Sequence, residues 1–79
     1  MSIQTSLWIH GGDNPYTLVV EPWANEYKIL PGDKCLLVAA NPEKQSFFEL
    51  ELLDNNYLIV YVNVAGTTYE FYRNDMPAT

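Results

Sequence analysis

The sequence predicts a small all-β domain, an antiparallel β-sandwich or partly open barrel of six to seven strands. The first reason is a period of two: residues 47–53 and 57–64 alternate apolar side chains with Glu49, Glu51 and Asn63. This alternation is typical of strands that bury one face. The second reason is that Gly, Pro, Asn and Asp separate the apolar runs, as expected for turns. The third is that Tyr, Val, Ile, Thr and Phe dominate the runs, which disfavours helix.

Seven segments are expected to form strands. They are residues 3–9, 16–21, 26–30, 34–40, 46–53, 57–64 and 67–73. Pro31 and Gly32 fit the second and third positions of a type II turn, because Gly tolerates a positive φ. The segment that follows this turn is apolar on both faces, as expected of a central strand. A helical turn, if one forms, is expected at residues 22–26 or 41–45.

Hairpin registers can be predicted because a slip of one residue would exchange the core and solvent faces. A three-residue loop at residues 54–56 is expected to pair Leu53 with Tyr57 and Phe48 with Val62. This loop is expected to hold an Asn in the left-handed conformation.

Two further hairpins are expected on the same reasoning. A turn at residues 65–66 would pair Val62 with Tyr69, and an earlier loop would pair Val20 with Tyr27. Together these registers assign one set of side chains to the core: Phe48, Leu50, Leu52, Leu58, Val60, Val62, Val64, Tyr69 and Phe71.

Length and composition indicate one domain, residues 1–73, followed by a flexible C-terminal tail at 74–79. The chain has 79 residues, of which 48% are apolar and 14% aromatic, so side-chain burial alone could stabilise it. A single cysteine, Cys35, excludes an internal disulfide and argues against a small secreted scaffold. The N-terminal residues do not resemble a signal peptide, and no apolar run approaches the ~20 residues of a membrane span. A soluble, cytoplasmic protein without membrane contact is therefore expected.

The charge balance bears on the partner. Four basic residues stand against ten acidic ones, a net charge of −6. Nucleic-acid binding through phosphate contacts is disfavoured, because it needs a basic face. A basic protein partner is the more specific interpretation, whereas a merely soluble acidic surface is the alternative.

The most suggestive surface is the outer face of the last three predicted strands. Tyr61 is expected to lie between Glu49 and Glu70. Its other neighbours are expected to be Tyr57, Ile59 and Tyr72. Tyrosines flanked by carboxylates suit a protein-docking patch, although cross-strand aromatic pairs can also simply stabilise a sheet.

A second candidate is the corner around Trp23 and Tyr27. A Pro-Trp corner with two carboxylates, Glu21 and Glu26, could offer an aromatic platform to a sugar ring or a peptide. The favoured alternative is that Trp23 plugs the end of the β-structure.

One segment carries a resemblance. The string Val-Val-Glu-Pro-Trp at residues 19–23, then Glu26-Tyr27, then Leu-Pro-Gly-Asp at 30–33, resembles a pattern in small uncharacterised bacterial proteins over about residues 14–38. The Pro-Gly-Asp step is also similar to turns in cupredoxin and cupin sandwiches, where it is common. The resemblance implies a bacterial source and attaches no activity.

Residue chemistry disfavours an enzyme and a cofactor. A blue-copper centre needs two His and a Cys, usually with a Met, whereas this chain has one His, His10, with Cys35 and Met76. A structural zinc site needs four N or S ligands, and this chain offers only one His and one Cys. A hydrolase would need His10 and Asp13 to meet a nucleophile such as Ser46 or Cys35, and no nucleophile-elbow motif is present.

These observations lead to a functional expectation by elimination. We expect a non-catalytic protein-binding module without a cofactor. The alternative is a carbohydrate-binding module that uses Trp8, Trp23 or Tyr27 as stacking platforms. A homodimer formed by edge-strand pairing is also compatible with so small a sheet.

Overall fold

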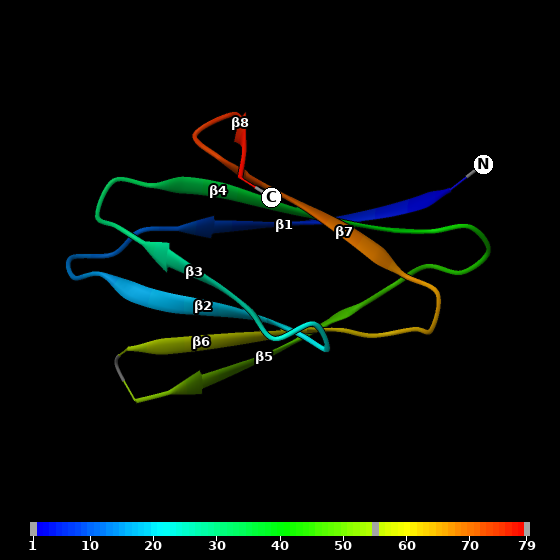
Figure 1. Cartoon of the computed structure of the whole chain (residues 1–79), viewed down its shortest axis with the longest axis horizontal. Coiled ribbons are helices and arrows are strands. Elements are labelled where there is room, and N and C mark those ends of the chain that lie inside the picture. The colour runs from blue at the N-terminus through cyan, green and yellow to red at the C-terminus, as the bar shows by residue number, and fades with distance from the viewer. Residues whose placement is uncertain (1, 55, 79) are drawn as a thin grey trace.

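Two four-stranded sheets pack face to face in the computed structural model, which describes residues 2–54 and 56–78 (Figure 1). The strands are β1 (Ile3–His10), β2 (Tyr16–Glu21), β3 (Asn25–Ile29), β4 (Lys34–Asn41), β5 (Phe48–Leu53), β6 (Tyr57–Val62), β7 (Thr68–Arg73) and β8 (Met76–Pro77). The described residues form no helix, and so none that could cross a bilayer. The predicted all-β class is confirmed, and the architecture is a sandwich.

The chain crosses repeatedly between the two sheets. The first sheet has the order β1-β4-β7-β8, and the second has the order β3-β2-β6-β5. The chain therefore leaves one sheet for the other after β1, β3, β4 and β6, as Figure 1 shows. Strands β2 and β6 pair in parallel, while the other strand pairs are antiparallel.

The β5–β6 hairpin has the predicted register. Leu53 pairs with Tyr57 and Phe48 pairs with Val62. In the loop it is Asp54 that takes the left-handed conformation, with φ of 48°, and Asn55 lies outside the described residues. Asp54 suits this position because its side chain accepts a hydrogen bond from the Asn56 amide at 2.8 Å.

The predicted β2–β3 register is wrong by two residues. Val20 pairs with Asn25 and not with Tyr27. The hairpin closes earlier because Ala24 adopts a left-handed conformation, with φ of 60°. A shift of two preserves the alternation, so the inward side chain of Ile29 is still fully buried.

The predicted β6–β7 hairpin is wrong. Strand β7 pairs with β4 in the first sheet, and the edge of β6 that it was expected to occupy is taken by β2. Val64 and Gly66 both have positive φ, 86° and 85°, and the Thr67 amide donates to the Val64 carbonyl at 3.3 Å. These residues turn the chain from one sheet to the other, so Val62 and Tyr69 do not face each other across a hairpin.

The core lies between the sheets. Its buried members are Ile9, Leu18, Val20, Ile29, Cys35, Leu37, Ala39, Val60, Val62 and Phe71. Cys35 is buried as predicted, and this burial raises the pKa of its thiol. Asn41 and Ser46 are also buried, and both side chains are hydrogen-bonded. Among the described residues no buried side-chain nitrogen or oxygen lacks a partner.

The segment assigned to a C-terminal tail is in part an edge strand. Asn74 and Asp75 have left-handed φ values of 49° and 67° and reverse the chain. Met76 then pairs with Arg73 in β8, and the Ala78 amide donates to a β7 carbonyl at 2.8 Å. The domain therefore extends past residue 73 to residue 78, the last one described.

The turn before β4 is held by one carboxylate. The Asp33 amide donates to the Leu30 carbonyl at 3.0 Å, and Gly32 has φ of 87°, in agreement with the predicted turn. The Asp33 carboxylate accepts hydrogen bonds from the Leu30 amide at 2.8 Å and from Asn74 at 3.3 Å, and pairs with Arg73. The Leu30 bond first, then Asn74 and Arg73, hold the pKa of Asp33 below its ordinary value despite partial desolvation.

This lowered pKa predicts a pH dependence. A carboxyl whose pKa is lower in the folded state stabilises the fold above the unfolded pKa of about 3.9, and that contribution is lost as the pH falls through the folded value. We expect Asp33→Asn to cost stability at pH 7, and to cost less at pH 3. Urea unfolding followed by circular dichroism at both pH values measures this. Asp13→Asn, at an exposed loop position, controls for the loss of one charge, and an Asp33→Asn deficit that is the same at both pH values contradicts the assignment.

Candidate functional site

The outer face of the second sheet gathers part of the predicted docking surface. Tyr57, Ile59 and Tyr61 alternate along β6 and point away from the buried Val60. Glu49 lies opposite Tyr61, as predicted. Glu70 was expected on the other side of Tyr61, but Glu21 of β2 lies there.

We call this surface the acidic face, and its residues are Glu21, Glu49, Glu51, Tyr57, Ile59 and Tyr61. The Tyr61 hydroxyl donates to Glu51 Oε1 at 2.9 Å, and Asn63 Nδ2 donates to Glu49 Oε1 at 2.9 Å. The hydrogen bond to Glu51 is the main reason that the pKa of Tyr61 is raised. Desolvation and the charges of Glu51, Glu21 and Glu49 add to the effect. Tyr61 thus lies in a strongly negative environment.

The remaining predicted residues of this surface lie on the other sheet. Glu70 and Tyr72 belong to β7, and the Tyr72 hydroxyl donates to Glu70 Oε2 at 3.0 Å. The predicted patch is therefore two separate surfaces, because β7 pairs with β4 and not with β6.

Tyr72 belongs to a row of three apolar side chains on the outer face of the first sheet. Trp8 pairs with Leu36, and Leu36 pairs with Tyr72. We call this row the tryptophan platform. Trp8 is 49% exposed, and the Nζ atom of Lys34 lies 4.7 Å from the centroid of its ring. With Asp75, these four side chains line a shallow depression of about 170 Å³.

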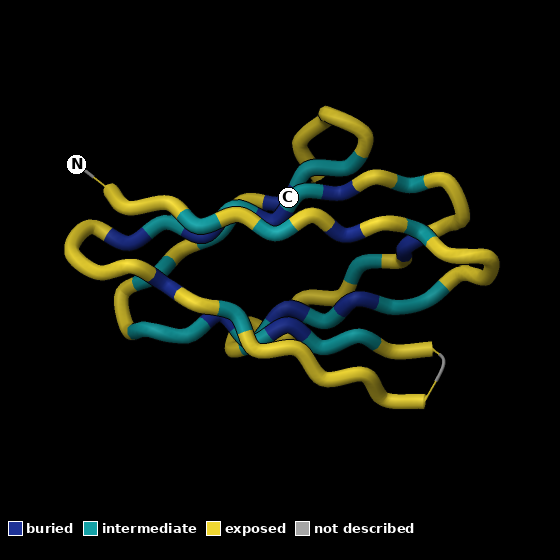
Figure 2. Tube along the Cα trace, turned by 180° about the vertical axis from the view of Figure 1, so that it is seen from behind, coloured by how far each residue is buried: buried dark blue, intermediate teal, exposed yellow. Residues whose placement is uncertain are grey.

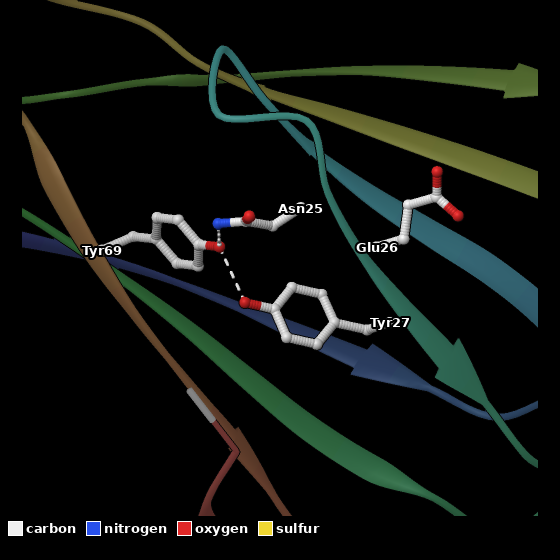
Figure 3. A pocket seen from close by; sticks show the side chains of 4 residues that line it. All are labelled: Asn25, Glu26, Tyr27 and Tyr69. Carbon is white, nitrogen blue, oxygen red and sulfur yellow. Dashed lines mark hydrogen bonds between the residues drawn. The ribbon is translucent and has the colours of Figure 1, made fainter.

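The predicted Trp23–Tyr27 corner exists, and its aromatic rings pack on β7. The Trp23 ring lies 4.6 Å from that of Tyr69, and the Tyr27 ring stacks on Phe71 at 4.2 Å. Figure 3 shows the two phenols of Tyr27 and Tyr69 pointing toward each other, and their oxygens are 2.7 Å apart. Asn25 also donates to the Tyr69 oxygen, at 2.5 Å. These contacts join the edge strand of one sheet to the other sheet, while Trp23 itself stays 39% exposed.

The phenol pair has a consequence for ionisation. Partial burial first, and then the hydrogen bond and charge of Tyr69, raise the pKa of Tyr27 well above its ordinary value. The Tyr27 hydroxyl therefore stays protonated at neutral pH. The hollow of about 390 Å³ beside them is lined by Asn25, Glu26, Tyr27 and Tyr69, but the Glu26 carboxylate points away from the phenols (Figure 3).

One surface was not predicted. Leu50 and Leu52 of β5 were expected in the core, yet they are 57% and 71% exposed. Their partners in the register are Val60, which is fully buried, and Leu58, which is partly buried. We call Leu50 and Leu52 the leucine rim. The strand β5 is an edge of the second sheet, and it is exposed along most of its length (Figure 2).

The leucine rim is exposed because the core side of β5 extends beyond what the first sheet covers. Phe48, at the start of β5, still packs against the core. The next two inward side chains, those of Leu50 and Leu52, do not pack against the core. Alternation correctly predicts their side of the sheet, but it carries no information on whether a second layer reaches that far.

The residues considered for metal or hydrolytic chemistry are not brought together in an accessible site. Cys35 and Ser46 are buried, and Ser46 Oγ lies 2.9 Å from Thr67 Oγ1. Met76 lies on β8, exposed. Among the residues that the structure describes, no three His, Cys, Asp or Glu side chains cluster as metal ligands.

No family model, curated protein or solved structure matches the chain. The similarity of residues 14–38 to small bacterial proteins therefore remains a prediction.

Proposed function

We propose that this domain is a non-catalytic module that binds another protein through the β5 side of its second sheet. The observation that carries the proposal is the leucine rim: two large apolar side chains exposed on an edge strand, next to the acidic face. Exposed apolar groups that are contiguous and bordered by polar residues mark interaction sites more often than isolated ones do. Phe47, just before β5, and Leu53, at its end, are 54% and 44% exposed, and by alternation they lie on the other face of the strand, beside Glu49 and Glu51.

The charge of the neighbouring face favours a basic partner. Glu21, Glu49 and Glu51 surround Tyr61. The one ion pair in the described part of the chain is Arg73 with Asp33, so these three carboxylates have no basic partner there. Complementary charge on the partner would speed association and fix its orientation.

The test is a pair of matched variants. Leu50→Ser with Leu52→Ser removes the leucine rim, and Leu30→Ser removes a leucine that is 48% exposed on a turn outside this surface. Both proteins should remain folded, because the replaced side chains are largely in solvent. We expect wild type and Leu30→Ser to capture the same protein from the native cell extract. Once this partner has been purified, the two should bind it with equal affinity. We expect the double variant to lose at least about tenfold in affinity, corresponding to about 1.4 kcal/mol. Equal binding by the double variant would contradict the proposal.

A second candidate function rests on the tryptophan platform. An exposed indole beside a tyrosine and above a shallow hollow suits stacking on a sugar ring, as the carbohydrate-binding alternative requires. Trp23→Phe leaves Trp8 as the sole tryptophan, so fluorescence then reports on this platform alone. A titration with soluble oligosaccharides should shift the emission of Trp8 if this function holds, and an unchanged spectrum with every sugar removes it.

A further inference from the structure

We infer that β5 binds an extended segment of the partner as an additional strand of the second sheet, and that this segment alternates apolar residues with Lys or Arg. The inference rests on the proposed protein-binding function and specifies how the surface works. Three independent features of β5 support it: free backbone groups, uncovered leucines and two carboxylates, Glu49 and Glu51, that form no ion pair with the described residues.

The free backbone groups follow from the hydrogen-bond pattern. The Asn63 amide donates to the Phe47 carbonyl at 3.0 Å, so this pair is hydrogen-bonded. In an antiparallel ladder, hydrogen-bonded and non-hydrogen-bonded pairs alternate. Glu49, Glu51 and Leu53 therefore bond to β6, whereas the backbone groups of Phe48, Leu50 and Leu52 point toward the open edge. An added strand would pair with these three residues.

The side chains of the same residues point to the core side of the sheet. An added antiparallel strand would place a residue opposite Leu50 and another opposite Leu52, on the side where both leucines are exposed. Apolar residues at these positions would cover the leucine rim and extend the buried layer that Val60 begins. This explains why leucines occupy positions that the domain itself leaves uncovered.

The other face of the added strand would meet carboxylates. Glu49 and Glu51 point outward, and each accepts one hydrogen bond, from Asn63 and Tyr61. Directly opposed side chains on one face of a sheet interact, and opposite charges stabilise the pair. Lys or Arg at the intervening positions of the segment would therefore fit. The required pattern is a strand with apolar and basic residues in alternation.

A second copy of this chain fits less well. If two β5 strands paired antiparallel through all their free groups, Leu50 would face Leu50 of the other copy and Phe48 would face Leu52. In this register Glu49 of each copy would lie opposite Glu51 of the other. Like charges in directly opposed positions destabilise a sheet, so the acidic row disfavours this homodimer and favours a basic segment.

The other sheet edges lack this combination. Strand β1 is a long edge, but its inward Ile9 is buried and its outward side chains carry no carboxylate. Strand β3 carries Lys28, and β8 has only two residues, including Pro77. Lysine, proline and short length are features that discourage strand addition. Strand β5 has none of the three.

The probe is a capped peptide of about nine residues that alternates lysine and valine, long enough to span a typical strand. Two control peptides are used: one alternates glutamate and valine, and one has the lysine–valine composition in blocks. Titration is followed by calorimetry and by amide shifts. We expect the alternating lysine–valine peptide to bind and to shift the amides of Phe48, Leu50 and Leu52. The controls should bind at least about tenfold more weakly, a difference of about 1.4 kcal/mol.

Leu50→Pro and Leu50→Ala form the decisive pair. Both remove the leucine side chain, but proline also removes an N–H group that points to the open edge and has no hydrogen-bond acceptor among the described residues. Proline is tolerated at such edge positions, so both variants should fold. We expect peptide binding to weaken modestly in Leu50→Ala and to fall below detection in Leu50→Pro. The charge reversal Glu49→Lys with Glu51→Lys should exchange the preference from the lysine peptide to the glutamate peptide.

Several outcomes would overturn the inference. They are equal binding of the three peptides and equal binding by Leu50→Pro and Leu50→Ala. A third is a dimer in light scattering whose β5 amides are protected from hydrogen exchange. The proposed function fails separately: it falls only if Leu50→Ser with Leu52→Ser keeps full affinity for the cellular partner. A partner lost by that double variant but bound equally by the Pro and Ala variants would leave a protein-binding surface that works without strand addition.

Discussion

Replacing Phe71 by Ala is expected to lower the free energy of unfolding by about 3–5 kcal/mol. Phe71 is completely buried, with 0% of its surface exposed to solvent. It is the largest such side chain among the described residues. Its ring stacks on Tyr27 of the other sheet, with centroids 4.2 Å apart. Alanine would leave a cavity between the sheets and remove one of the contacts between edge strand β3 and the first sheet.

The loss would be a large part of the total stability. A domain of this length has an unfolding free energy of about 4–12 kcal/mol, at roughly 0.05–0.15 kcal/mol per residue. Urea unfolding followed by circular dichroism measures the change. Leu52→Ala is the matched control, because Leu52 is 71% exposed, and it should change stability by less than about 0.5 kcal/mol. A Phe71→Ala protein within about 1 kcal/mol of wild type would mean that the two sheets do not pack as described.

Asn41→Ala is expected to cost about 2–3 kcal/mol, because Asn41 connects two crossings between the sheets. Its Oδ1 atom accepts hydrogen bonds from the amides of Glu43 and Lys44, at 2.9 and 2.8 Å. Its Nδ2 atom donates to the Ala65 carbonyl at 3.1 Å and to Thr67 Oγ1 at 3.0 Å. The side chain is 3% exposed, so water cannot readily replace it.

Two further variants separate the halves of this network. Asn41→Asp keeps an acceptor for the two amides but can no longer donate to the β6–β7 connection, and it brings a buried charge against a carbonyl. Thr67→Val removes one hydroxyl partner and should cost about 1 kcal/mol. Thermal and urea unfolding of the three variants provides the comparison. If Asn41→Ala costs no more than Thr67→Val, the network does not join the two crossings.

The local features of the fold were predictable from the sequence. The β5–β6 register followed from the alternation of Glu49 and Glu51 with leucines, because a two-residue loop would set Glu51 opposite Val60, whereas a three-residue loop keeps both carboxylates on the solvent side. The predicted β2–β3 register was wrong by two residues, because alanine gives no sequence signal for the left-handed φ that Ala24 adopts. The error left the core side chains on the correct face, because parity was preserved.

The non-local features were not predictable in the same way. Alternation specifies which face of a strand is apolar, but not which strand lies beside it. The parallel pairing of β2 with β6 joins segments about forty residues apart (Leu18 pairs with Leu58) and has no local signal. For this reason the adjacent strands β6 and β7 were wrongly joined in a hairpin, and Tyr61 was placed beside Glu70.

The candidate site was only partly predictable for a related reason. Glu49, Tyr57, Ile59 and Tyr61 share one surface, as expected from their spacing. Leu50 and Leu52 were assigned to the core because sequence patterns cannot show where the opposite sheet ends.

Amide hydrogen exchange along β5 tests the central claim most directly, since that claim is that this strand has one bonded and one free edge. In the free protein, the amides of Glu49 and Glu51 should exchange slowly, and those of Phe48, Leu50 and Leu52 should exchange fast. Adding the alternating lysine–valine peptide should slow the fast set and leave the slow set unchanged. Slow exchange at all five positions in the free protein, or fast exchange that the peptide does not alter, would contradict the account.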